Sequence, residues 1–186
     1  VNHQSNFDIP VLVQALPQFQ LRWLAKKELF WIPLFGWAMW AAKHITVDRA
    51  NSLDALKSLK LAKQRIAAGI SVVVFPEGTR STDGKLLPFK RGGFLLALKS
   101  KTPIVPVTIN GTGKLLARGE WRVRPGAIDV TIGAPIAAAD FRPGGLRDLS
   151  AQVQEIIAAN LRTSDPMSAS QENLTGAAIT PQGRTV

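Results

Sequence analysis

The feature that most constrains the fold is an amphipathic helical segment that leads almost directly into a short β-branched run. Residues 52–69, SLDALKSLKLAKQRIAAG, place apolar side chains on one stripe at helical spacing, with a polar cap before them and Gly69 at their end. The run SVVVF that follows is typical of a short buried strand, and Pro76 ends it. A helix that feeds a buried strand predicts an α/β fold.

The rest of the chain continues the alternation of strands and helices. Residues 103–109 (PIVPVTI) and 127–133 (AIDVTIG) read as two further strands, and the apolar spacing over 146–161 predicts a closing amphipathic helix. A chain of 186 residues has the length of one domain. We therefore expect a single α/β domain over residues 1–161, with a central, mixed, mostly parallel sheet flanked by helices. Residues 162–186 are polar and rich in small side chains, which predicts a disordered tail.

Composition excludes several kinds of chemistry. The chain has no cysteine, so thiol nucleophiles, thiolate metal sites and disulfides are ruled out, and two histidines argue against a histidine-rich metal site. The formal net charge of +10 favours an anionic partner: a nucleic acid, an anionic membrane surface or a phosphorylated substrate. Composition alone does not choose among these three. For the basic residues of the helical segment a solvated face is sufficient explanation; these are Lys57, Lys60, Lys63 and Arg65.

The first residues, VNHQSNFDIP, contain one of the two histidines and admit two interpretations. Ser5 to Asp8 has the S-x-x-D form of a capping box, in which both side chains satisfy free backbone N–H groups at a helix start. Alternatively, Asp8 fixes the tautomer of His3, whose other ring nitrogen is then ready to accept a proton. The two are compatible if His3 lies in the turn before the helix.

A second unusual stretch is ELFWIPLFGWAMWAA, which places Trp31, Trp37 and Trp40 within ten residues. At about fifteen residues, interrupted by Pro33 and Gly36, it is shorter than the roughly 20 residues that span a bilayer. Tryptophan favours the headgroup level of a membrane, so one interpretation is a segment that lies on the bilayer. The other is a pair of core helices whose tryptophans pack against the sheet.

Three further stretches look like functional loops. In an α/β sheet, ligands collect at the carboxyl ends of strands, where two of these loops are expected. Arginine suits a phosphate, glycine allows close backbone approach, and a helix N-terminus adds favourable partial charge. Each loop also has an ordinary interpretation as an ion pair or a solvated turn. The three are Asp48-Arg49 in ITVDR, Glu77 to Ser81 in VVVFPEGTRS, and Lys90-Arg91 in PFKRGG.

Together and in this order, these motifs resemble the glycerophospholipid acyltransferase family, in particular the bacterial-type lysophosphatidic acid acyltransferases. The four signatures of that family appear as NHQSNFD, a second over residues 43–49, FPEGTRS and IVPVTIN, and the similarity covers roughly residues 1–135. The second signature commonly opens with glycine, where this chain has Lys43. The family usually has an apolar or amphipathic segment ahead of its first signature, so we expect that this sequence lacks the N-terminal part of a longer protein.

The resemblance implies a fold like that of glycerol-3-phosphate acyltransferase and a reaction. A fatty acyl group passes from acyl-CoA or acyl carrier protein to the free hydroxyl of lysophosphatidic acid, which gives phosphatidic acid. His3 is the implied general base and Asp8 orients it. No metal and no bound cofactor are called for. The implied substrate-binding residues, mainly for the acceptor's phosphate, are Arg49, Glu77, Gly78, Thr79, Arg80 and Lys90.

We also expect the protein to work on the cytoplasmic face of the cell's inner membrane, attached peripherally or through the missing N-terminal part. The alternatives are acyl transfer to glycerol 3-phosphate or another lysolipid, and a non-catalytic basic module that binds membranes or nucleic acid. Nucleic-acid binding predicts aromatic side chains interleaved with basic ones. Here the tryptophans instead cluster in an apolar segment, so we expect no nucleic-acid partner.

Overall fold

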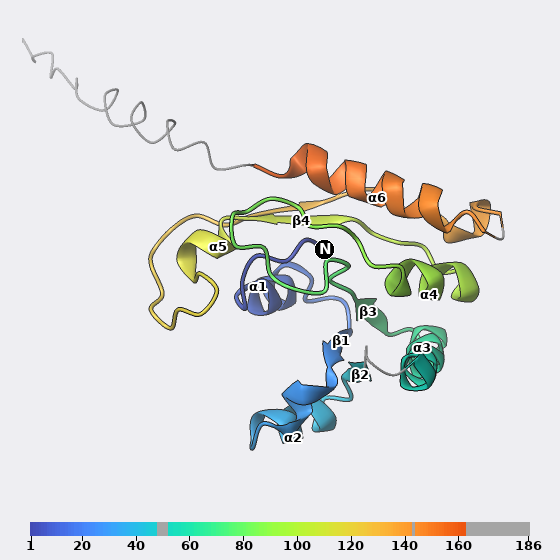
Figure 1. The fold of residues 1–186 in the computed structure, drawn as a ribbon, viewed down its shortest axis with the longest axis horizontal. Coiled ribbons are helices and arrows are strands. Elements are labelled where there is room, and N and C mark those ends of the chain that lie inside the picture. The colour runs from blue at the N-terminus through green and yellow to red at the C-terminus, as the bar shows by residue number, and fades with distance from the viewer. Residues whose placement is uncertain (48–51, 143, 163–186) are drawn as a thin grey trace, which may run out of the picture.

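A computed structural model of the chain describes residues 1–47, 52–142 and 144–162. Its helices are α1 (Asp8–Ala15), η1 (Lys27–Trp31, 3₁₀), α2 (Phe35–Ala41), α3 (Ser52–Ala67), α4 (Gly92–Ser100), α5 (Thr112–Leu115), η2 (Ala138–Asp140, 3₁₀) and α6 (Leu146–Asn160). Its strands are β1 (Leu21–Lys26), β2 (Ile45–Val47), β3 (Ser71–Val73), β4 (Val107–Asn110) and β5 (Asp129–Ile132). The α/β class expected from the sequence is confirmed, and Figure 1 shows the arrangement.

The parallel part of the fold is a three-stranded sheet in the order β2-β1-β3. Lys26 pairs with Val47 on one side of β1, and Trp23 pairs with Val73 on the other. Strand β1 was not expected from the sequence, although it is the central strand. Its buried side chains, Leu21 and Trp23, pack with residues from α1 and β4 in one apolar cluster. Because the three strands are parallel, the segments that follow β1, β2 and β3 leave the sheet at the same edge.

The other two strands form a separate antiparallel pair, β4 with β5, in which Val107 pairs with Ile132. The expected central sheet is thus divided into two smaller ones. The predicted strand over residues 103–109 enters the ladder only at Val107. Pro106 has no N–H to donate, and before it a single bridge joins Ile104 to Ile136.

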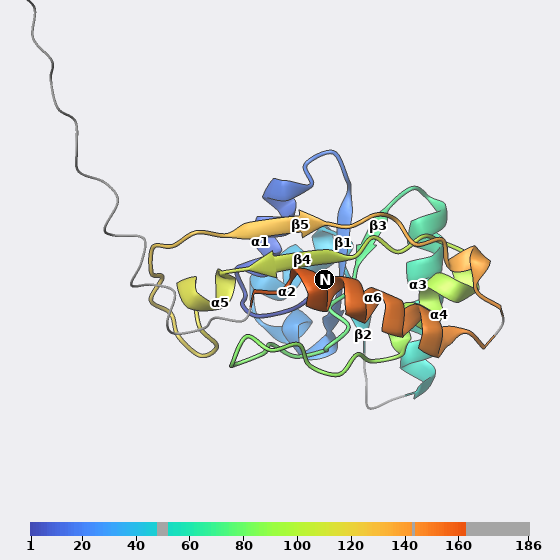
Figure 2. The ribbon, with the colours of Figure 1, turned by 90° about the horizontal axis from the view of Figure 1, so that it is seen from above.

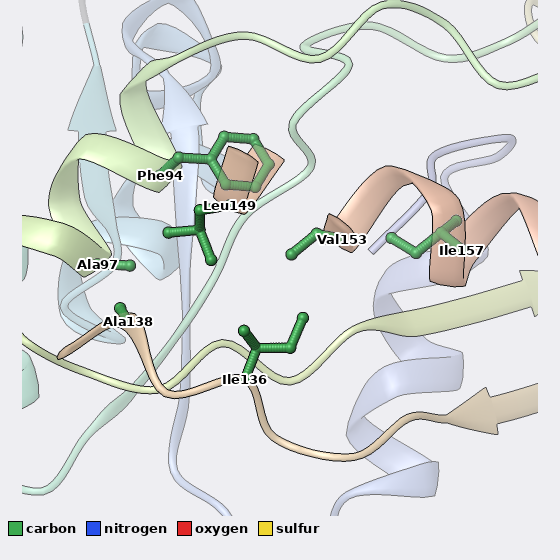
Figure 3. Packing of buried hydrophobic residues seen from close by; sticks show 7 residues of the cluster. All are labelled: Phe94, Ala97, Ile136, Ala138, Leu149, Val153 and Ile157. Carbon is green, nitrogen blue, oxygen red and sulfur yellow. The ribbon is translucent and has the colours of Figure 1, made fainter. Parts of the chain in front are cut away.

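The two long helices are present where the sequence placed them. The predicted helix over residues 52–69 is α3, which buries Ala62 against Ile45 and Leu96, and the predicted closing helix is α6. In Figure 3, three side chains of α6 face the apolar side chains of α4 and of the segment after β5; they are Leu149, Val153 and Ile157. Seen from above, α6 runs along β4, with α3 and α4 at one end of the molecule and α5 at the other (Figure 2).

The tryptophan-rich segment is on the surface. Trp31, Trp37 and Trp40, which we call the tryptophan patch, are 77%, 71% and 77% exposed, so their interpretation as core residues is wrong. Helix α2 projects from the domain beyond the carboxyl end of β1 (Figure 1). Among the described residues, no helix has both the length and the apolar character needed to cross a bilayer.

Candidate active site

The first signature forms a turn and the start of α1, and it brings His3 and Asp8 together. Nδ1 of His3 lies 2.7 Å from Oδ2 of Asp8, which is fully buried, whereas the His3 side chain is 15% exposed. An ionised carboxylate only accepts hydrogen bonds, so Nδ1 carries the proton and the second ring nitrogen, Nε2, is left to accept one. His3 precedes α1, as the compatible interpretation of capping and chemistry requires.

The Asp8 carboxylate is held by backbone and side-chain donors. Oδ2 also accepts the backbone N–H groups of Gln4 (2.8 Å) and Ser5 (3.0 Å), and Oδ1 accepts the hydroxyl of Thr112 (2.5 Å). Ser5 Oγ accepts the N–H of Phe7, but Phe7 is the N-cap residue of α1 and has no side-chain cap hydrogen bond. Of the predicted capping box, only the bond from the Ser5 N–H to Asp8 is present. This set of donors fixes the orientation of the carboxylate and stabilises its negative charge in a buried place.

The first signature is also attached to β4 and α5. The buried side chain of Asn2 accepts the N–H of Ile109 and donates to its carbonyl, each at 2.8 Å, as a neighbouring strand would. The hydroxyl of Ser5 donates to the carbonyl of Leu116 at 2.7 Å. The fourth signature and the residues after it therefore form the support on which the His3 turn rests.

Residues of the third signature contact the ring and the backbone of His3. The ring of Phe75 stacks on the imidazole, with centroids 4.0 Å apart and an interplanar angle of 17°. The N–H of His3 donates to Glu77 Oε1 at 2.7 Å, and the carbonyl of His3 accepts the N–H of Ser81 at 2.8 Å. Phe75 thus covers one face of the imidazole, and Asp8 holds its Nδ1. Glu77 and Ser81 hold the backbone of His3.

The family resemblance implies that Glu77 is one of the substrate-binding residues. In the structure it is buried, and its second oxygen accepts the N–H of Leu87 at 2.9 Å, so both oxygens hold backbone groups of the site. Burial raises the pKa of the Glu77 carboxyl, and the hydrogen bonds from Leu87 and His3 oppose that rise. This geometry gives Glu77 a part in fixing the loop around His3.

The other predicted phosphate-binding residues lie on two adjoining segments. Gly78 has φ 72°, a left-handed conformation that glycine adopts without strain, and it turns the chain toward Thr79 and Arg80. Lys90 is exposed, and its N–H donates to the carbonyl of Pro76 at 2.8 Å, which joins the segment before α4 to this loop. The structure thus gathers Gly78, Thr79, Arg80 and Lys90 near the His3 turn.

The second signature is described only in part. Arg49 lies outside the described residues. Lys43, which stands where the family commonly has glycine, has φ 57°. The left-handed backbone that glycine favours is therefore kept here by a lysine, at a cost of about 1–2 kcal/mol.

A mainly apolar pocket of about 640 Å³, partly open to solvent, lies next to the site. Side chains from α1, β1, β3, α4 and β4 line it, and it reaches Val1 and Pro76 beside the His3 turn and the third signature. Such a space has the character of a site for an apolar ligand.

Sequence reasoning did not identify three residues of the site: Asn2, Phe75 and Thr112. Asn2 and Phe75 belong to signatures whose other members were predicted, but no local pattern indicates which partners they contact. Thr112 follows β4, and its contact with Asp8 spans 104 positions of the chain. Its sequence signal is a polar side chain two positions after the end of a buried strand.

Comparisons with known proteins agree with this geometry. A family model described as Acyltransferase matches residues 1–110. The chain is 40% identical over 164 residues to a 1-acyl-sn-glycerol-3-phosphate acyltransferase of Limnanthes alba, covering 88% of this chain and 58% of that protein. It is 34% identical over 154 residues to 1-acyl-sn-glycerol-3-phosphate acyltransferase alpha of Homo sapiens, covering 82% of this chain and 54% of that protein.

Among solved structures, the chain is similar to the 1-acyl-sn-glycerophosphate (LPA) acyltransferase PlsC of Thermotoga maritima. The TM-score is 0.73 and the identity 32%, and the match covers 88% of this chain and 66% of that one. The chain spans just over half the length of the two curated relatives described above and 66% of the length of the solved one.

Proposed function

Because the chain belongs to the acyltransferase family, as its four signatures predicted, we propose that it transfers a fatty acyl group to the free hydroxyl of lysophosphatidic acid. The product is phosphatidic acid, a step of phospholipid biosynthesis. The relatives named 1-acyl-sn-glycerol-3-phosphate acyltransferases support this choice of acceptor. The observation that carries the proposal is the His3–Asp8 pair, in which a buried carboxylate holds Nδ1 and leaves Nε2 available.

The proposed chemistry follows from that pair. Nε2 of His3 removes the proton of the acceptor hydroxyl as its oxygen attacks the carbonyl carbon of the acyl thioester. Asp8 stays ionised and stabilises the imidazolium, as the aspartate of a Ser-His-Asp triad does. When the tetrahedral intermediate collapses, the carbon–sulfur bond breaks and the thiol leaves with the proton that His3 returns. An ester of the acceptor forms, and His3 is again neutral.

Phosphate binding is assigned to the loop after β3. Arg80 supplies a planar, bidentate donor, Gly78 and Thr79 allow close backbone approach, and Lys90 adds positive charge. We propose Arg49 as a further contact, on the resemblance alone. Glu77 supports the backbone around this site, because its two oxygens accept the N–H groups of His3 and Leu87.

The acyl donor is a thioester of coenzyme A or of acyl carrier protein. The mainly apolar pocket next to the His3 turn supports a fatty acyl group as ligand, since its lining is mainly aliphatic. No metal or bound cofactor takes part in this scheme.

We further propose that the protein works at an anionic membrane surface, on the cytoplasmic face of the inner membrane, where acyl donors are made. The tryptophan patch supports this, because the three exposed indoles, one on η1 and two on the projecting α2, have the chemistry of the headgroup region. The net charge of +10 adds attraction to anionic lipid.

The test is an assay of the intact protein with lysophosphatidic acid and acyl-CoA, in which thiol release is followed. We expect His3→Ala and Asp8→Asn each to lower turnover by about 10²–10⁴-fold, the usual contribution of general-base catalysis, without unfolding the domain. His44→Asn is the matched control, because His44 is the other histidine and contacts β1 instead of the site. Near-normal turnover in His3→Ala would overturn the mechanism. A panel with glycerol 3-phosphate and other lysolipids in place of lysophosphatidic acid tests the choice of acceptor.

A further inference from the structure

The segment between α5 and β5 is an exposed loop at one end of the molecule. Figures 1 and 2 both show it at the end opposite α3 and α4. Every residue from Arg118 to Ala127 is exposed, and we call this stretch the Arg-Trp loop. Trp121 is 91% exposed and Val123 is 53% exposed, so the loop presents apolar side chains that no described part of the chain covers.

The returning arm of the Arg-Trp loop is held at two positions, Arg124 and Ala127. The N–H of Arg124 donates to the carbonyl of Leu115 at 2.8 Å, which holds the returning arm against α5. Gly111, with φ 96°, lies so close to Ala127 that a Cβ on it would be 2.2 Å from the Ala127 carbonyl oxygen. Trp121 is therefore presented from a supported loop and not from a free chain end.

The base of the loop is joined to the proposed active site. The carbonyl of Leu116 accepts the hydroxyl of Ser5, and Thr112 of the same α5 segment donates to Asp8. A surface that binds the loop is therefore held at a fixed position and orientation relative to the His3 turn.

The charges of the loop select an anionic partner. It carries Arg118, Arg122 and Arg124 against one acidic residue, Glu120. Arg124 pairs with Glu120 at 2.9 Å, which leaves the excess positive charge on Arg118 and Arg122, on either side of Trp121. An indole between two guanidinium groups suits the bilayer interface, where the ring reaches below the headgroups and the cations meet lipid phosphates.

We propose that the Arg-Trp loop is a second membrane contact, separate from the tryptophan patch, and that its partner is the surface of an anionic bilayer. The inference rests on the proposed function, because a lipid acceptor has to reach His3 from a membrane. Two contacts on different elements fix the orientation of the domain, which one contact does not. A nucleic acid is disfavoured, because stacking on successive bases needs several aromatic side chains and the loop has one.

The chain has no cysteine, so one introduced residue gives a unique labelling position. Val123→Cys, labelled with a polarity-sensitive fluorophore, reports on the loop beside Trp121. We expect a blue shift with vesicles that contain phosphatidylglycerol and little shift with phosphatidylcholine alone. Gln64→Cys, on an exposed position of α3, is the control and should show no shift. A label at residue 123 that stays in water while the protein binds the vesicles overturns the inference.

Substitutions give a second measurement by vesicle sedimentation. Trp121→Ser should weaken partitioning about tenfold, and the double variant Arg118→Ala/Arg122→Ala about thirtyfold at low salt. Lys60→Ala/Lys63→Ala removes the same charge from α3, and we expect a much smaller loss. Equal losses in the two double variants would show that only net charge acts, and would contradict a specific contact.

Activity separates this inference from the proposed function. With lysophosphatidic acid in detergent micelles, Trp121→Ser should turn over like the unchanged protein, whereas His3→Ala should not. If the unchanged protein fails to acylate any acceptor, the proposed function fails. If it is active and Trp121→Ser partitions normally, the loop inference alone fails.

Discussion

At the scale of single residues, Thr112 holds the oxygen of Asp8 that does not face His3. Both side chains are fully buried, so the oxygen has no water to replace this hydrogen bond. We expect Thr112→Val, which keeps the shape and removes the hydroxyl, to lower kcat about tenfold with little change in KM, since a charge-assisted bond of about 1.5–3 kcal/mol orients the carboxylate. Steady-state kinetics with lysophosphatidic acid measures this.

Thr112→Ser is the matched control for that prediction, because it restores the hydroxyl in a smaller side chain. It should recover most of the lost turnover. If the valine and serine variants have equal kcat, Thr112 fills space and does not position Asp8.

At the scale of elements, His44 links β2 to β1 and makes that link sensitive to pH. Its Nδ1 accepts the backbone N–H of Trp23 at 3.2 Å, and burial, with a smaller effect of Arg22, lowers the pKa of His44 below its ordinary value of 6.5. Between pH 6.5 and the lower pKa that His44 has in the folded protein, the unfolded chain binds more protons than the folded one. The stability of the folded protein therefore falls as pH falls through this range. Above pH 6.5 this contribution to stability is fully present.

We therefore expect the free energy of unfolding to decrease as pH is lowered below 6.5, and His44→Asn to reduce that decrease. Asparagine keeps an acceptor for the Trp23 N–H and does not titrate. Urea denaturation at pH 7 and at pH 5 measures the difference. An identical pH dependence in both proteins would show that other groups cause it.

At the scale of the whole molecule, Asn2 joins the His3 turn to β4, 107 positions away. It is 2% exposed, and without it the N–H and the carbonyl of Ile109 lose their partner in the interior. We expect Asn2→Ala to lower the free energy of unfolding by about 2–4 kcal/mol, since each orphaned group costs about 1–3 kcal/mol. Asn6→Ala changes the same residue type in the same turn at an exposed position, and should change stability by less than about 0.5 kcal/mol. Similar losses in both variants, measured by urea denaturation, would contradict this role for Asn2.

The sequence by itself determined what depends on neighbours a few positions apart. Apolar side chains at helical spacing indicated α3 and α6, and the β-branched runs indicated β3, most of β4, and β5. His3 and Asp8 lie five positions apart, so one turn before α1 is enough to bring them together. The order of the four signatures predicted the family, which the comparisons confirm. The predicted domain boundary at residue 161 stays a prediction.

Only the tertiary structure decided what depends on contacts between distant segments. Strand β1 has no continuous β-branched run, and it becomes the central strand because Leu21 and Trp23 are buried against α1 and β4. The division into two sheets depends on which strands pair, and these lie in distant parts of the chain. The bond from the His3 N–H to Glu77 and the bond from Thr112 to Asp8 also join residues far apart in the chain. Local pattern also left open whether the tryptophans lie in the core or on the surface. Burial is a property of the packed molecule, and spacing alone does not show which apolar side chains find a partner.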